Sequence, residues 1–142
     1  MSYRCEHFRI EELVSPEAFQ MLHEDVLWSA FDEDLLKAAD WLRERYGRCT
    51  INNWLWSGGF TQSVLRTKDS RFYSPGSQHS IGCALDMKFS DYSAEYIRDD
   101  LAAMELAGEE IPRGIRRIER GVSWLHIDCK ETNQATIYWF NP

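Results

Sequence analysis

Residues 84–89 read Ala84-Leu85-Asp86-Met87-Lys88-Phe89, and this alternation of apolar and charged side chains predicts a β-strand. Successive side chains on a strand point to opposite faces, so the second, fourth and sixth residues of this run share an apolar face. Asp86 and Lys88 share the other face. The acid is therefore not aimed into the core, and Asp86 is available to bind a ligand.

A second alternating stretch reads Ser123-Trp124-Leu125-His126-Ile127-Asp128-Cys129. The same period of two directs its aliphatic residues and Cys129 into the core, whereas Trp124, His126 and Asp128 share the opposite face. An imidazole and a carboxylate two residues apart on a strand lie side by side. We expect Trp124 to border any site built on this face, and we interpret Cys83 and Cys129 as buried packing residues.

Around these two stretches the sequence predicts three helices and three more strands. Helix starts are expected at Ser15, Asp32 and about Ser93, and glycine stops for the second and third helices at Gly47 and Gly108. In the first helix, Phe19, Leu22 and Val26 recur at helical spacing. Strands are expected over 50–54, 84–89, 115–119, 123–129 and 135–140, with a hairpin at Arg120-Gly121. This order predicts an α+β fold in which helices pack on a small, mostly antiparallel sheet.

Composition limits the classes of protein to consider. The chain has 142 residues, 44% of them hydrophobic, which predicts one globular domain over residues 1–142. A net charge of −7 disfavours nucleic acid as a partner. No apolar run is long enough for a membrane span, and the first residues lack the pattern of a signal peptide. Four scattered cysteines without a CxxC pair fit neither a disulfide framework nor a zinc knuckle.

The two alternating stretches together offer His79, Asp86 and His126. Gly82 allows the backbone to turn between His79 and Asp86, so that the imidazole and the carboxylate face a common ion. Two histidines and one carboxylate leave the fourth tetrahedral position open, as in a catalytic rather than a structural zinc site. The sequence therefore predicts a bound Zn²⁺ as cofactor.

The pattern Ser-x-His-x-x-Gly-x-Ala-x-Asp, which spans Ser77 to Asp86, is followed by Trp-x-His-x-Asp at 124–128. This combination resembles the M15 zinc peptidases, which include D-alanyl-D-alanine carboxypeptidases and the L-alanyl-D-glutamate endopeptidases that serve as phage endolysins. The family is similar to the zinc-binding part of Hedgehog domains. The likeness extends to residues 8–13 and 56–66 and so covers most of the chain.

The resemblance implies a Hedgehog/DD-peptidase-like fold and a metallopeptidase that cleaves the peptide part of peptidoglycan. It implies that His79, Asp86 and His126 hold zinc and that Arg66 and Ser77 contact the substrate. A guanidinium at Arg66 suits the carboxylates of stem peptides. The phage-encoded branch is the most similar, so we expect a monomer made in the cytoplasm and delivered to the cell wall during lysis or in the virion.

The sequence departs from the family where many members place the catalytic acid, three residues before the second histidine. Ser123 stands there and is unable to act as a carboxylate base. Asp128, which shares the strand face of His126, is the preferred candidate base, and the same position would also allow it to orient His126 or to ligate zinc itself. Glu119 is the other candidate, because the hairpin through Arg120 and Gly121 returns it toward the ligand strand.

Two alternatives to a peptidase follow from the same residues. The missing acid at Ser123 fits a zinc-binding module that has no catalytic activity. A structural or tail-associated phage protein, with only local wall-digesting activity, is the second alternative. Release of new amines from wall fragments separates the first from an enzyme, and co-purification with particles identifies the second.

Overall fold

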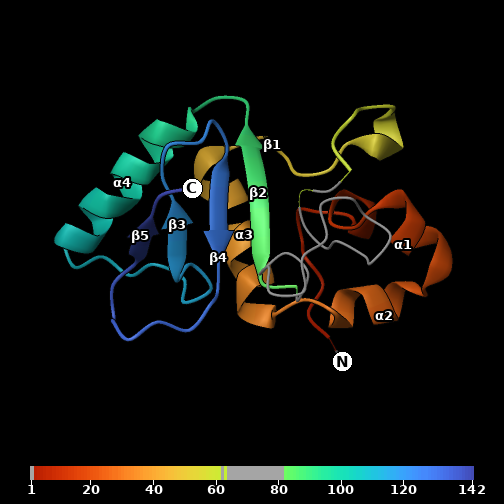
Figure 1. Ribbon diagram of the computed structural model, residues 1–142, viewed down its shortest axis with the longest axis horizontal. Helices are drawn as coiled ribbons and strands as arrows, with labels where there is room; N and C mark the ends of the chain where they lie inside the picture. Colours follow the sequence, from red (N-terminus) through yellow and green to blue (C-terminus); the bar gives the residue numbers. More distant parts are fainter. Residues whose placement is uncertain (1, 62, 64–81) are drawn as a thin grey trace.

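The computed structural model describes residues 2–61, residue 63 and residues 82–142 (Figure 1). In this part of the chain five strands form one sheet in the order β1-β2-β4-β3-β5. Their bounds are Cys49–Thr50, Ala84–Phe89, Arg117–Glu119, Leu125–Asp128 and Tyr138–Phe140 for β1 to β5. The β1–β2, β2–β4 and β4–β3 pairs are antiparallel, and β3–β5 is parallel. The predicted α+β class with a mostly antiparallel sheet is confirmed.

The N-terminal region differs from its prediction. After the short 3-10 helix η1 (Ile10–Glu12), Ser15 caps α1 as expected by accepting from the amide of Ala18 at 3.2 Å. However, α1 (Pro16–Met21) ends where Leu22 adopts an extended conformation, and a separate helix α2 (Glu24–Ser29) begins after His23. This break interrupts the helical phase, so the predicted apolar stripe is wrong: its three residues are all exposed. The buried positions are Ala18, Leu27 and Trp28.

Helix α3 (Glu33–Tyr46) forms as predicted. Asp32 caps it by accepting from the amide of Leu35 at 3.0 Å, and Gly47 ends it at a φ of 86° that favours glycine. One charged residue of α3, Asp40, is buried. Its carboxylate accepts from the Tyr3 hydroxyl at 2.6 Å and from the amides of Glu6 and His7, which fastens the N-terminal segment to α3.

Helix α4 (Ala94–Leu106) also agrees with its prediction. Ser93 accepts from the amide of Tyr96 at 3.0 Å, and the helix closes just before Gly108, whose φ is 73°. Its buried side is formed by Ile97, Leu101 and Met104. None of the helices in the described ranges is long and apolar enough to cross a membrane.

The predicted strand over 50–54 is mostly wrong. Only Cys49–Thr50 pair with β2, and the chain then enters a second 3-10 helix, η2 (Trp54–Trp56). Two asparagines explain the change, because their side chains bond to backbone groups instead of extending the ladder. Asn52 donates to the carbonyl of Val14 at 2.9 Å, and Asn53 accepts from the amide of Phe60 at 2.8 Å. The strand over 84–89 has its predicted bounds, and β3, β4 and β5 begin two to three residues later than predicted.

The apolar face of the sheet packs against α3, which lies behind β2 and β4 in Figure 1, while α4 covers the end near β5. The core includes the alternating residues predicted for this face: Leu85, Met87, Leu125 and Ile127. The opposite face carries Asp86, Lys88, His126 and Asp128, again as the period of two predicted. That face is where the candidate ligands meet.

Gly82 joins the start of β2 to the loop before α3. Its φ is 75°, and a Cβ at this position would collide with the carbonyl oxygen of Ala30. Its own carbonyl accepts from the amide of Asp32 at 3.1 Å. Both the conformation and the close approach therefore require glycine here.

Candidate active site

Antiparallel pairing of β2 with β4 places Asp86 directly opposite His126. The amide of Asp86 donates to the carbonyl of Ser63 at 2.9 Å, on the side of β2 away from β4. Asp86 and His126 are therefore a non-hydrogen-bonded pair, the type in which facing side chains are closest. Asp86 Oδ1 lies 2.8 Å from His126 Nδ1. The structure thus brings together two of the three predicted ligands, one from each alternating stretch.

The third predicted ligand, His79, lies outside the described residues, as do Arg66 and Ser77. Their assignment as a zinc ligand and as two substrate contacts stays a prediction. The described part of the site consists of β2, β3, β4 and β5, and its geometry is set by the register of these strands.

The second nitrogen of His126 is also engaged. Its Nε2 lies 2.9 Å from Oδ2 of Asp128, a carboxylate with no exposed surface. Arg117 faces Asp128 across β3 and β4 and donates to both carboxylate oxygens, at 2.8 and 2.9 Å. A bidentate pair of this kind fixes the orientation of the carboxylate. Arg117, Asp128, His126 and Asp86 thus form a continuous hydrogen-bonded row across three strands.

This row determines the protonation of His126. Nε2 donates to Asp128, which leaves Nδ1 facing the acceptor Oδ1 of Asp86, so a proton or another cation is required between them. Burial would lower the pKa of His126, but the hydrogen bonds to Asp128 and Asp86 raise it to about 9. Burial would raise the pKa of Asp128, but hydrogen bonds from His126 and Arg117 hold it below its ordinary value. In the metal-free protein His126 is therefore an imidazolium at neutral pH.

The metal-free protein should lose stability as the pH rises. Because the folded-state pKa of His126 lies above its unfolded value, its stabilisation is complete below about pH 6.5 and is lost as the pH passes 9. The loss should be on the order of 3 kcal/mol. Denaturant unfolding in the presence of a chelator at pH 6 and pH 9.5 measures this loss. In the control variant His126→Gln, the free energy of unfolding should change much less between the two pH values. An equal change in the free energy of unfolding for the two proteins would contradict the charged state assigned to His126.

Glu119 shares the face of His126. Ile118 on β3 faces Ile127 on β4, so the next residue pair along these strands is Glu119 and His126. The carboxylate of Glu119 is half-buried, and no described residue hydrogen bonds to it. The hairpin predicted to return Glu119 is present, with Gly121 at a φ of 75°. The two candidate bases therefore differ: both oxygens of Asp128 are hydrogen bonded, and among the described residues neither oxygen of Glu119 is.

Aromatic side chains border the row of polar groups. The Phe140 ring on β5 meets the His126 ring edge to face, with centroids 5.7 Å apart. The guanidinium of Arg117 lies over the same Phe140 ring at 4.3 Å. Trp124, which was predicted to border the site, is 37% exposed at the start of β4, and its carbonyl accepts from Arg98 at 3.2 Å.

The site also contains residues to which sequence reasoning gave no role. Arg117 is one, and the signal that could have found it is its spacing of two from Glu119, since residues two apart on a strand share a face. Lys88 is the other. Its ammonium donates to the Ser63 hydroxyl at 2.7 Å and lies 4.3 Å from the centre of the Phe60 ring. Burial lowers the pKa of Lys88. No carboxylate among the described residues lies within ion-pair distance of it, which leaves a positive charge beside Asp86.

The two described members of the predicted ligand set, Asp86 and His126, have donor atoms of the kind that zinc binds. Zinc bonds of 2.0–2.2 Å to nitrogen and oxygen place two tetrahedral ligand atoms roughly 3.4 Å apart, so a small separation of Asp86 from His126 would admit the ion. The outer nitrogen of His126 already donates to a carboxylate, as histidine ligands of metals almost always do. A metal would also replace the proton that the Asp86–His126 contact requires. The donor set of Asp86 and His126 is therefore compatible with the predicted cofactor.

The chain matches no family model, no curated protein and no solved structure.

Proposed function

We propose that the protein is a zinc-dependent peptidase that hydrolyses an amide bond in the stem peptides of peptidoglycan. The observation that carries this proposal is the row Asp86–His126–Asp128–Arg117. It places two potential ligand atoms, Asp86 Oδ1 and His126 Nδ1, side by side on one face of the sheet. The hydrogen bond from His126 Nε2 to Asp128 fixes the orientation of the ring. The resemblance to M15 peptidases supports the same reading. It also supplies the proposed setting of a phage-encoded, monomeric enzyme that acts on the wall after delivery.

In this proposal His79, Asp86 and His126 hold the ion. Bound zinc would lower the pKa of a water molecule and polarise the scissile carbonyl. Asp128 holds the Nε2 proton of His126 and so directs Nδ1 toward Asp86. Arg117 keeps Asp128 ionised and in place, which makes both of them positioning residues rather than reacting groups.

Glu119 is the proposed proton acceptor. Its carboxylate lies on the face of His126, is half-buried and has no hydrogen-bond partner among the described residues, so it is available to take a proton from the attacking water. The same carboxyl group then returns the proton to the leaving amine. Asp128 is less suited to this step, because its two oxygens already accept from Arg117 and His126.

Substrate contacts follow from charge. The resemblance assigns Arg66 and Ser77 to contact the substrate, and the guanidinium of Arg66 would bind a carboxylate of the stem peptide. Lys88 adds a partly buried ammonium on the face of Asp86, without an acidic partner in the described ranges. Trp124, which immediately precedes β4, adds an exposed side chain. These groups would hold a peptide against the ligand pair.

Purified muropeptides test the proposal directly. We expect the zinc-loaded protein to release a new amine and a shorter stem, both visible by mass spectrometry. Products should disappear after chelation and return when zinc is added back. Cleavage that persists through chelation would exclude a metallopeptidase. Zinc binding without any product would favour the non-catalytic zinc module that Ser123, in place of the family's acid, also fits.

A further inference from the structure

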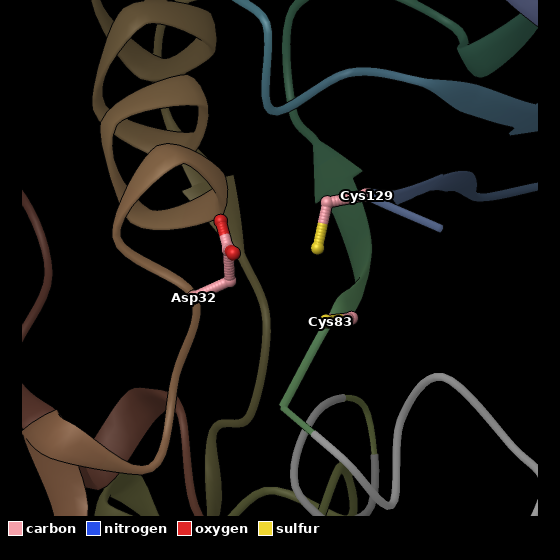
Figure 2. A group of neighbouring side chains, drawn as sticks. All are labelled: Asp32, Cys83 and Cys129. Carbon is pink, nitrogen blue, oxygen red and sulfur yellow. The ribbon is translucent and has the colours of Figure 1, made fainter. Parts of the chain in front are cut away.

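Three potential metal ligands gather on the core side of the sheet, away from His126. Asp32, Cys83 and Cys129 each offer one ligand atom, and these atoms all lie within 4.8 Å of one another. Figure 2 shows the Cys129 sulfur pointing down toward Cys83, with the Asp32 carboxylate beside them at the start of α3. Asp32 is the N-cap of α3, Cys83 immediately precedes β2 and Cys129 immediately follows β4.

Backbone hydrogen bonds hold the three residues in place. Ala84 on β2 faces Asp128 on β4, so Cys83 and Cys129, the next residues at this end of the two strands, also face each other. The amide of Cys129 donates to the carbonyl of Cys83 at 3.0 Å. Asp32 is joined to the residue before Cys83 by its amide, which donates to the carbonyl of Gly82. The sheet register and the loop before α3 therefore set the positions of all three residues.

The thiols of Cys83 and Cys129 are hydrogen bonded to each other and differ in this from the other two cysteines. The other two thiols each contact a backbone carbonyl oxygen, Cys5 at 3.6 Å from Leu36 and Cys49 at 3.9 Å from Thr50. Within the described ranges, Cys83 and Cys129 donate to no carbonyl. Asp32 uses one oxygen, Oδ1, to cap α3 and makes no ion pair with a described lysine or arginine. The expected burial of both cysteines is incomplete, since each is half-buried, and Asp32 is exposed, so an ion has access.

We propose that Asp32, Cys83 and Cys129 form a second metal site for a thiophilic divalent ion such as Zn²⁺ or Cd²⁺. Two thiolates with one carboxylate match the ligand preference of these ions and leave a fourth position for water. Binding converts two thiols to thiolates and releases two protons. The resulting complex carries one net negative charge, which the positive N-terminal end of α3 stabilises.

This site does not depend on the proposed peptidase. Its ligands lie on the opposite sheet face from His126, and its effect would be structural, because one ion would connect α3, β2 and β4. An ion that binds the folded chain more tightly than the unfolded chain raises stability. A zinc-loaded chain with both sites filled should hold two ions. Substitution of the ligands of one site should remove one ion and leave the other bound.

Titration with Cd²⁺ alone, under a phosphine reductant, tests the site on the full chain. Sulfur-to-cadmium charge transfer should appear in the ultraviolet and saturate at one equivalent of thiolate-bound ion. The Cys83→Ser/Cys129→Ser double variant should lose this band, whereas the matched Cys5→Ser/Cys49→Ser variant and His126→Ala should keep it. A band that survives in the Cys83→Ser/Cys129→Ser variant, or that is absent from the unmodified chain, would overturn the proposal.

Asp32→Asn tests the carboxylate without removing the helix cap, because asparagine caps a helix as well as aspartate does. We expect the affinity for Cd²⁺ to fall by roughly tenfold or more while the metal-free melting temperature changes little. An unchanged affinity would remove Asp32 from the ligand set. Muropeptide cleavage reports on the other face, so failure of the peptidase proposal leaves these readouts intact.

Discussion

His126→Ala is expected to reduce muropeptide hydrolysis by at least roughly 10³-fold, the largest change in activity that any single substitution in the described residues should produce. The substitution removes a proposed zinc ligand and the group that connects Asp86 with Asp128. Zinc bound at this face should also disappear. Product formation by mass spectrometry and metal content by atomic emission measure the two losses.

A matched control is available in His7. The exposed imidazole of His7 lies 2.9 Å from Glu44 on the surface, and alanine keeps the backbone amide that donates to Asp40, so His7→Ala should leave hydrolysis unchanged. Metal content is best compared in the Cys83→Ser/Cys129→Ser background, where the second proposed site is absent. Circular dichroism should confirm that His126→Ala remains folded. Full cleavage by a folded His126→Ala protein would remove this residue from the mechanism.

Arg117→Met is expected to cause the largest loss of stability, about 3–5 kcal/mol. Asp128 has no exposed surface, and Arg117 supplies two of its hydrogen bonds. Methionine keeps much of the side-chain volume but leaves a buried carboxylate with a single charged partner, His126. Urea unfolding, monitored by tryptophan fluorescence at neutral pH, measures the change in the free energy of unfolding.

The neighbouring Arg116 provides the comparison. It pairs with the exposed Glu131 at 3.7 Å, so Arg116→Met should cost less than about 1 kcal/mol. Addition of Asp128→Asn to Arg117→Met should recover part of the loss, because the buried charge is then gone. Similar losses for the two arginine variants would show that burial of Asp128 does not determine the stability of this region.

The sequence was sufficient to predict the faces of the two ligand strands. Alternation is a local property, and one face of each strand is buried, so Asp86 and His126 could only point to the other side. Their close approach also required the register of β2 against β4. That register arises from long-range packing and is not written in either stretch alone.

The arrangement behind His126 could not be predicted in the same way. Parity placed Asp128 on the right face and left open whether it was a base or an orienting group. Both oxygens of Asp128 accept hydrogen bonds from Arg117, and the two residues face each other only because β3 pairs with β4. Glu119 became the better candidate base for the same reason, because a neighbouring strand, not its own sequence context, sets its surroundings.

Errors in the fold have local causes. Phe19, Leu22 and Val26 do recur at helical spacing, but α1 ends before Leu22 and α2 begins at Glu24. Residues in two separate helices do not share one helical face, so the spacing does not place them together. The expected strand over 50–54 has suitable apolar residues. Its asparagines instead bond to backbone groups of distant segments, which no pattern of hydrophobicity records.

Strand β5 is the last of the five to leave the ribosome, yet it enters the sheet beside β3 and brings Phe140 against the His126 ring. The carbonyl of Phe140 also accepts from the amide of Arg120 at 2.7 Å. A nascent chain that has not yet released β5 therefore lacks one wall around its histidine. The surroundings of His126 are therefore complete only after β5 has joined the sheet beside β3.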